Sequence, residues 1–127
     1  MYRLLLIFFG GGAGSILRYL LQGGLHRLAG ESFPWGTTVV NISGCFLIGL
    51  LGGLFFGPRP IPEDYRVAIL IGVLGGYTTF STFAWETMQL SDDREFLYAS
   101  LNVVLSIAVG LAAVWLGKQL VLVIYGA

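Results

Sequence analysis

The sequence predicts an all-α membrane protein with four transmembrane helices, the third of them broken near its middle. Of its 127 residues, 56% are hydrophobic and 11% are charged, and the mean hydropathy is +0.81. This composition is typical of integral membrane proteins. A spanning helix needs about 20 mainly apolar residues, and we expect a single four-helix transmembrane domain over residues 1–127. The predicted spans are Leu4 to Leu25, Gly36 to Phe56, Arg66 to Leu90 and Phe96 to Ile124.

The first two spans have features of retained, closely packed helices. Arg3 precedes an apolar run, as in a signal sequence, but apolar character resumes after Arg18 and no clear cleavage site follows. Arg18 itself either reaches the membrane interface or attracts anions at a vestibule. Trp35 follows a proline at the start of the second span, which is typical of an interfacial anchor. Glycine pairs that favour close helix contact are Gly10 with Gly14, Gly49 with Gly53 and Gly72 with Gly76.

A stretch rich in glycine and hydroxyl groups divides the third span. Gly75 and Gly76 have a large backbone entropy cost in a helix, and the hydroxyls of Thr78 and Thr79 compete for local backbone groups. We therefore expect the helix to open between Gly75 and Thr79. Irregular backbone at membrane depth survives only where protein buries it or a polar cavity solvates it. Such a break implies an ion or substrate site, or at least a tightly packed crossing.

Two phenylalanines follow this break on one helix face. Phe80 and Phe83 are three residues apart, whereas Ser81 and Thr82 between them point elsewhere. The pair can be core residues, but the positive edges of aromatic rings can also meet an anion that has lost part of its water. A helix that restarts near Thr78 directs free amides and a positive dipole end toward the same region. The carbonyls left by the break could instead bind a small cation.

Polar side chains also lie inside the other apolar spans. Thr37 and Asn41 are four residues apart on one face of the second span, where they either hydrogen-bond to another helix or face a polar pathway. Asn102 and Ser106 form a similar stripe on the fourth span. Glu86 is the only carboxylate expected inside a span. It is a functional candidate unless it lies at the interface and binds a neighbouring helix.

The charges are nearly balanced across the predicted membrane. Four basic residues fall on the side of the termini and three on the other side, so the orientation rule gives almost no bias. Insertion in both orientations, and hence an antiparallel dual-topology homodimer, becomes possible. The formal net charge of zero gives no support for a nucleic-acid partner. One histidine and one cysteine, Cys45, supply no disulfide, metal cluster or catalytic set, so we expect no enzyme.

Three motifs combine these features. They are Gly11-Gly12-xx-Ser15-xx-Arg18-Tyr19, Pro34-Trp35-Gly36-Thr37-xxx-Asn41-xx-Gly44 and Gly75-Gly76-Tyr77-Thr78-Thr79-Phe80-Ser81-Thr82-Phe83. The set resembles the Fluc (CrcB) fluoride ion channel family. The resemblance implies a passive fluoride-selective channel that exports fluoride from a microbial cytoplasm and gives fluoride resistance. It also implies a dual-topology antiparallel homodimer with two pores, in the cell inner (plasma) membrane.

The resemblance assigns roles to individual residues. Phe80 and Phe83 would be pore phenylalanines whose ring edges contact fluoride, and Asn41 would be the pore amide. The carbonyls of Gly75 and Thr78, from both subunits, would hold a structural sodium ion at the dimer centre. Further polar groups of the vestibule and pore would be Thr37, Ser81, Thr82, Asn102 and Ser106.

The residues alone leave two other interpretations open. A dual-topology small multidrug-type exporter has a similar size and number of spans. Its proton coupling requires a membrane-embedded carboxylate, and only Glu86 could serve. A membrane protein that transports nothing would use its glycines and hydroxyls for helix packing alone, and it would conduct no ions.

Overall fold

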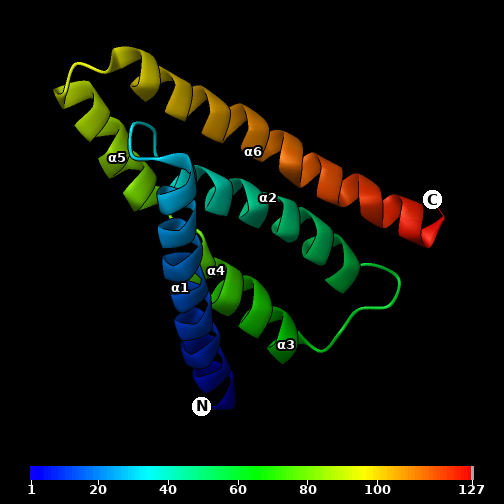
Figure 1. The fold of residues 1–127 in the computed structure, drawn as a ribbon. Coiled ribbons are helices and arrows are strands. Elements are labelled where there is room, and N and C mark those ends of the chain that lie inside the picture. Colours follow the sequence, from blue (N-terminus) through cyan, green and yellow to red (C-terminus); the bar gives the residue numbers. More distant parts are fainter. Residues whose placement is uncertain (127) are drawn as a thin grey trace.

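The computed structural model describes residues 1–126 and contains four long apolar spans (Figure 1). Three of them are continuous helices: α1 (Tyr2–Ala29), α2 (Trp35–Phe55) and α6 (Phe96–Tyr125). The third span covers Glu63–Asp92 and is interrupted. Each of the four is long and apolar enough to cross a membrane. The four predicted spans are therefore confirmed, with α1 extending about one turn beyond its expected end.

The third span is divided by two residues in extended conformation. Its helical pieces are α3 (Glu63–Val67), the π-helical turn η1 (Ala68–Val73), α4 (Leu74–Tyr77) and α5 (Phe80–Asp92). Thr78 and Thr79 leave the helix, with ψ angles of 158° and 116°. The predicted break is thus confirmed, but it is narrower than expected because Gly75 and Gly76 remain helical in α4. The π turn just before α4 was not predicted from the sequence.

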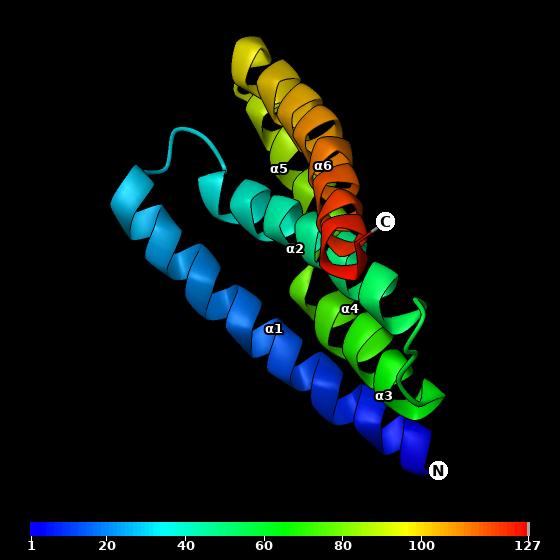
Figure 2. The ribbon, with the colours of Figure 1, turned by 90° about the vertical axis from the view of Figure 1, so that its right-hand side faces the viewer.

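Glycines bring α1 against the first half of the third span (Figure 2). A Cβ added at Gly10 would lie 2.8 Å from the carbonyl oxygen of Ala68, and one at Gly14 would collide with the carbonyl of Val73. On the other side of the contact, a Cβ at Gly76 would collide with the carbonyl of Gly11. Gly76 therefore serves close packing rather than the opening of the helix. The predicted use of these glycine pairs for helix contact is confirmed.

α2 and α6 lie side by side and form the other close helix pair (Figures 1 and 2). A Cβ at Gly49 of α2 would collide with the carbonyl of Val114, and one at Gly117 of α6 would collide with the carbonyl of Phe46. A Cβ added at Gly53 would lie 2.8 Å from the side chain of Val121. The backbones of the two helices therefore approach closely over more than two turns.

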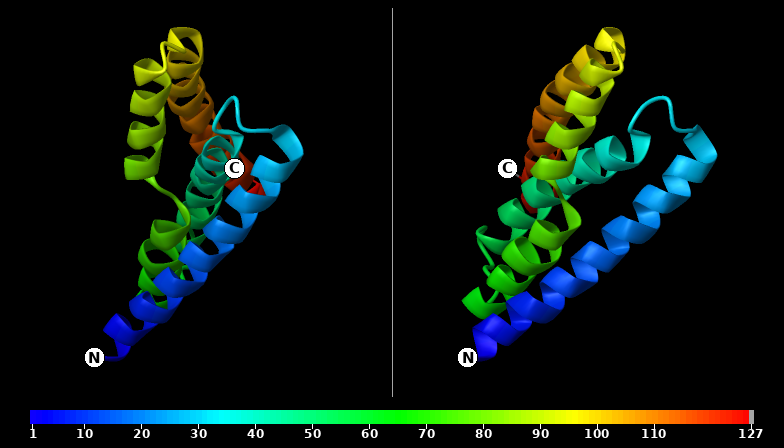
Figure 3. Two further views of the ribbon diagram at one scale, coloured as in Figure 1. Left: turned by 60° about the vertical axis from the view of Figure 1, so that its left-hand side comes forward. Right: turned by 90° about the vertical axis from the view of Figure 1, so that its left-hand side faces the viewer.

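α5 differs from the long helices α1, α2 and α6 because none of its 13 residues is fully buried. It turns back into α6 through Asp93 to Glu95, where Arg94 has a positive φ of 61°. Figure 3 shows α5 displaced from α4 by the extended link and running beside α6, while α1 diverges from α6. Large apolar side chains are exposed on this part of a single chain, including Phe80, Trp85 and Ile107. Such a surface is suited to lipid or to a second protein surface.

Ion pairs join the amino end of α1 to the start of the third span. Arg3 lies 2.8 Å from Asp64 and 3.3 Å from Glu63, measured between guanidinium nitrogen and carboxylate oxygen. All three side chains are substantially exposed. The amino terminus and the connection before α3 therefore share one end of the bundle, as the four-span topology predicts.

Candidate ion pathway at the break in the third span

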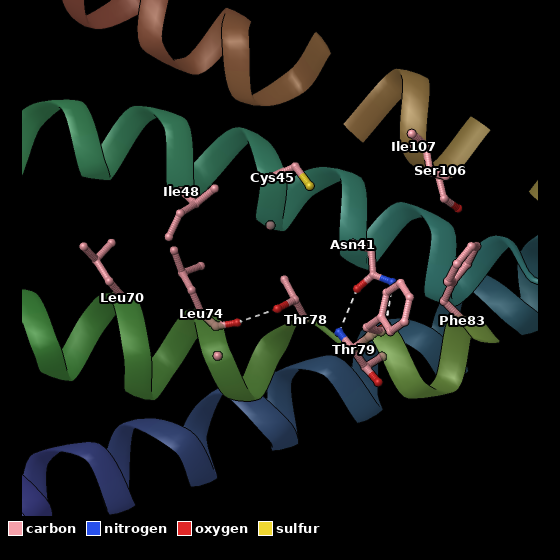
Figure 4. Close-up of a pocket in the computed structure, with 13 residues that line it drawn as sticks. Asn41, Cys45, Ile48, Leu70, Leu74, Thr78, Thr79, Phe83, Ser106 and Ile107 are labelled. Carbon is pink, nitrogen blue, oxygen red and sulfur yellow. Dashed lines mark hydrogen bonds between the residues drawn. The ribbon is translucent and has the colours of Figure 1, made fainter. Parts of the chain in front are cut away.

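The side chain of Asn41 clamps the extended backbone of the break (Figure 4). Its Nδ2 donates to the carbonyl oxygen of Thr79 at 2.8 Å, and its Oδ1 accepts from the amide nitrogen of Thr79 at 2.8 Å. Thr79 is 9% exposed, and its backbone groups would otherwise be costly to bury without partners. Of the two interpretations of Asn41, the interhelical hydrogen bond is thus present. Its role as a pore amide stays a prediction.

Thr79 is also the N-cap of α5. Its Oγ1 accepts from the amide nitrogen of Thr82 at 3.2 Å and donates to the hydroxyl of Thr82 at 3.0 Å. The helix therefore restarts at Phe80 rather than near Thr78, which corrects the expected position by two residues. A threonine followed three residues later by a polar residue is a common N-cap signal. It could have identified Thr79, which the sequence analysis did not assign to the site.

The carbonyls of Gly75 and Thr78 lose the donors that a continuous helix would supply. In such a helix the amide of Thr79 would bond to Gly75, and the amide of Thr82 would bond to Thr78. Instead, the Thr79 amide donates to Asn41 Oδ1, and the Thr82 amide donates to the Thr79 hydroxyl oxygen. Gly75 is exposed, and nothing lies within 4 Å of a Cβ added there. Two such carbonyls fit the donor type expected for sodium, but they need further oxygen ligands.

Phe80 and Phe83 lie together on the first turn of α5. Their ring centroids are 5.6 Å apart and their planes are tilted by 49°. Phe80 is 79% exposed on a single chain, whereas Phe83 is half-buried. Both line a cavity of about 360 Å³ that lies between α2, α6 and the two halves of the third span. The predicted shared face of the two rings is therefore confirmed.

The cavity brings together most of the predicted site residues (Figure 4). Its polar lining contains Asn41, Thr78, Thr79 and Ser106, and Gly75 lies at its edge. The apolar remainder of the wall comes from α2, η1, α4, α5 and α6. The cavity is open on one side of a single chain rather than enclosed. A second surface would be needed to close it into a pathway.

Four predicted site residues lie outside this lining: Thr37, Ser81, Thr82 and Asn102. Ser81 is exposed on α5, and Thr82 is engaged in the N-cap. Thr37 and Asn102 are buried, 4% and 1% exposed, in hydrogen-bond networks further along α5. The structure describes one chain, so their assignment to a pore or vestibule stays a prediction.

Asn102 connects α6 with both α5 and α2. Its Nδ2 donates to Thr87 Oγ1 at 2.9 Å, and Thr87 donates in turn to the carbonyl of Phe83 at 2.8 Å. Asn102 Oδ1 lies 3.2 Å from the hydroxyl of Thr38 and 3.5 Å from that of Ser106. The expected pairing of Asn102 and Ser106 on one face is confirmed. Thr38 and Thr87 were missed, because a lone hydroxyl in an apolar helix gives no sequence signal for its partner.

Glu86 is bound to a neighbouring helix. Thr37 Oγ1 donates to Glu86 Oε1 at 2.8 Å, and Gln22 Nε2 donates to Thr37 Oγ1 at 3.0 Å. Glu86 Oε2 is buried and has no hydrogen-bond partner among the residues that the structure describes. The carboxylate thus sits inside the bundle and contacts α2, which combines features of both interpretations left open by the sequence.

Comparisons with known proteins agree with this geometry. A family model described as "CrcB-like protein, Camphor Resistance (CrcB)" matches residues 5–118. A protein of Geobacter sulfurreducens named "Fluoride-specific ion channel FluC" is 47% identical over 117 residues, covering 92% of this chain and 94% of that protein. Proteins with the same name from Solibacter usitatus and Rhodospirillum rubrum are 48% and 49% identical over 119 and 111 residues. These two alignments cover 93% and 85% of this chain, and 97% and 85% of the relatives.

Both kinds of match extend across all four spans, from the amino-terminal part of α1 to the second half of α6. They include the break, the phenylalanine pair and the polar residues that face them. The chain belongs to the Fluc (CrcB) family of fluoride ion channels.

Proposed function

We propose that this protein is a fluoride-selective channel that lets fluoride leave the cytoplasm passively and so gives fluoride resistance. The relatives named as fluoride-specific ion channels support this proposal. The observation that carries it is the placement of Phe80 and Phe83 at the first turn of α5, beside a cavity that Asn41 and Ser106 also line. Ring edges, an amide and a hydroxyl then surround one region at membrane depth.

This arrangement suits the chemistry of fluoride. The ion is small and strongly hydrated, so a pathway must replace its water with several weak donors and avoid a deep trap. The positive ring edges of Phe80 and Phe83 and the amino end of α5 meet this need without a fixed cation. The membrane potential drives an anion outward with about 2.3 kcal/mol per 100 mV. Because hydrogen fluoride enters as a weak acid and dissociates inside, passive export needs no energy-coupling site.

The proposed assembly is an antiparallel dual-topology homodimer with two pores in the inner membrane. The open side of the cavity, the exposed Phe80 and the nearly even basic charge on the two sides of the chain support it. In such a dimer, the Gly75 and Thr78 carbonyls of the two subunits would together supply ligands for a structural sodium ion. Four carbonyls from two chains come closer to the coordination number of a hard cation than two from one chain.

The proton-coupled multidrug-type exporter is not favoured. The relatives that match most of the chain are named ion channels. Glu86, the one carboxylate that could carry protons within a span, receives a hydrogen bond from Thr37 and lies outside the cavity lining. A channel accounts for the phenylalanine pair, whereas proton-coupled cation export does not.

Fluoride efflux from liposomes tests the proposed function. Purified protein is reconstituted with fluoride or chloride inside, a potassium ionophore balances the charge, and an ion-selective electrode follows release. We expect rapid release of fluoride and none of chloride. Phe80→Ile, which keeps an apolar side chain but removes the ring edge, should slow fluoride release at least about 100-fold, because no other group replaces that weak donor. Absence of fluoride release from folded wild-type protein would refute the channel.

A further inference from the structure

Side-chain amides of three helices contribute to holding the second half of the third span. α5 has no fully buried residue, and the extended link separates it from α4. Three amides from three different helices bind it, directly or through a threonine hydroxyl: Asn41 of α2, Asn102 of α6 and Gln22 of α1. Asn41 and Asn102 belong to the predicted site. Gln22 has no role in either the sequence motifs or the proposed pathway.

The Gln22 connection has a defined direction. Gln22 Nε2 donates to Thr37 Oγ1 at 3.0 Å, so an acceptor position of that hydroxyl is filled. The single hydroxyl proton of Thr37 is then directed at Glu86 Oε1, 2.8 Å away. Thr37 is 4% exposed, so water does not compete for either bond. A chain of donors therefore runs from α1 through α2 to the middle of α5.

The backbone around Gln22 is adapted to this contact. A Cβ added at Gly36, the residue before Thr37, would lie 2.9 Å from the carbonyl oxygen of Gln22 and 3.0 Å from its Cα. Only glycine lets the two helices cross this closely. The crossing places the Gln22 amide over the Thr37 hydroxyl. The direct contacts of α1 with the third span described above lie further toward the amino end of α1, between Arg3 and Ser15.

We propose that Gln22 is a positioning residue for the ion pathway. Its amide orients the Thr37 hydroxyl onto Glu86 and thereby fixes the helix that carries Phe80 and Phe83. From α6, Asn102 acts through Thr87 on the carbonyl of Phe83. α5 is then held between two relays of the same form, an amide followed by a threonine hydroxyl. The effect of Gln22 on transport rests on the proposed fluoride channel, whereas its effect on α5 does not.

The first test is a double-mutant cycle on fluoride efflux. Gln22→Met keeps the length of the side chain and removes its hydrogen bonds, and Thr37→Val removes the hydroxyl at nearly constant shape. We expect each single change to lower the efflux rate by about three- to tenfold, the effect of losing one interhelical hydrogen bond. In the Thr37→Val background, Gln22→Met should have no further effect, because its only route to α5 is already absent. Gln89→Met, at an exposed glutamine on α5, is the matched control and should leave efflux unchanged.

The second test does not depend on transport. Amide hydrogen exchange of the reconstituted protein should be faster in Gln22→Met within residues 83–92 and unchanged within residues 63–77, with the melting temperature unchanged. Glu86→Met, which removes the acceptor for the Thr37 hydroxyl at a similar side-chain length, should give the same pattern and replaces Thr37→Val in the cycle if that variant does not fold. The proposal would be overturned if hydrogen exchange in α5 of Gln22→Met kept its wild-type rate, or if exchange became faster in all spans alike. It would also be overturned if the reductions in efflux caused by Gln22→Met and Thr37→Val multiplied in the double variant. If wild-type protein releases no fluoride, the proposed function fails, and the exchange pattern still decides the role of Gln22.

Discussion

The two halves of the third span are held in place by different physical means. The half before the break packs its backbone against α1, with Gly72 and Gly76 facing Ile7 and Gly11 at distances that admit no Cβ without a shift. The half after the break, α5, buries no residue fully and is bound by hydrogen bonds from amides and hydroxyls. Added side-chain volume disrupts close packing, whereas removal of a donor or acceptor disrupts a hydrogen bond.

This difference suits the proposed function of each half. The half before the break can act as a rigid base, because its backbone packs closely against that of α1. α5 presents Phe80 and Phe83 to the cavity and needs an open surface there, so burial cannot be what fixes it. Directional hydrogen bonds at its amino end and in its middle determine its position and leave the phenylalanine face free. Substitutions in the two halves should therefore have different kinds of effect.

The largest effect is expected from adding volume to the packed half. Gly14→Ala places a methyl group against the carbonyl of Val73 and 2.9 Å from the amide nitrogen of Tyr77. Backbone atoms cannot yield as a side chain can, so we expect a loss of about 3 kcal/mol in the free energy of unfolding. Unfolding in detergent, followed by circular dichroism against denaturant, measures it.

The matched control for this change is Gly12→Ala. Gly12 is exposed and has nothing within 4 Å of an added Cβ, and alanine has the better helix propensity. Its unfolding free energy should equal or slightly exceed that of the wild type. Equal stability of Gly14→Ala and Gly12→Ala would show that α1 and the third span do not pack as closely as described.

A smaller effect on stability, but a strong effect on transport, is expected at the break. Asn41→Leu removes both hydrogen bonds to the buried backbone of Thr79. Leaving that amide and carbonyl without partners should lower the free energy of unfolding by about 2 kcal/mol. Fluoride efflux should fall more than about tenfold, because the direction of α5 depends on this clamp.

Asn41→Asp separates the two bonds of the clamp. A carboxylate still accepts from the Thr79 amide but cannot donate to its carbonyl, and its negative charge beside the proposed fluoride cavity repels the anion, so efflux should fall at least as far as in Asn41→Leu. If both variants transport fluoride at the wild-type rate, the clamp is not needed to position α5. The same liposome assay gives all three values.

The smallest of these effects is expected for the N-cap. Thr79→Val keeps the shape of the side chain but cannot accept from the Thr82 amide. N-cap replacements cost about 1 kcal/mol, which should appear in the same unfolding experiment. Ser81→Ala, at an exposed position on the first turn of α5, should change stability by less than about 0.5 kcal/mol. Equal effects of the two changes would contradict the capping role of Thr79.

Much of the architecture follows from the sequence because it depends on local patterns. Span lengths and the position of the break reflect apolar runs, glycines and hydroxyls that lie within a few residues of each other. Faces follow from spacing as well: Phe80 meets Phe83, and Ser106 meets Asn102, as helical periodicity requires. The π turn in η1 was missed because no residue type marks it.

The sequence by itself determined four apolar spans long enough to cross a membrane, a break in the third of them between Gly75 and Thr79, and two phenylalanines beyond that break. Only the tertiary structure decided which polar groups form hydrogen bonds with each other. Gln22 and Gln89 are both glutamines on apolar helices, yet one is the donor to Thr37 and the other is exposed. The physical reason is that spacing along a helix fixes the face of a residue but not the helix across from it. Which helix lies across from a residue depends on where two backbones can approach closely. At Gln22, Gly36 of α2 allows that approach.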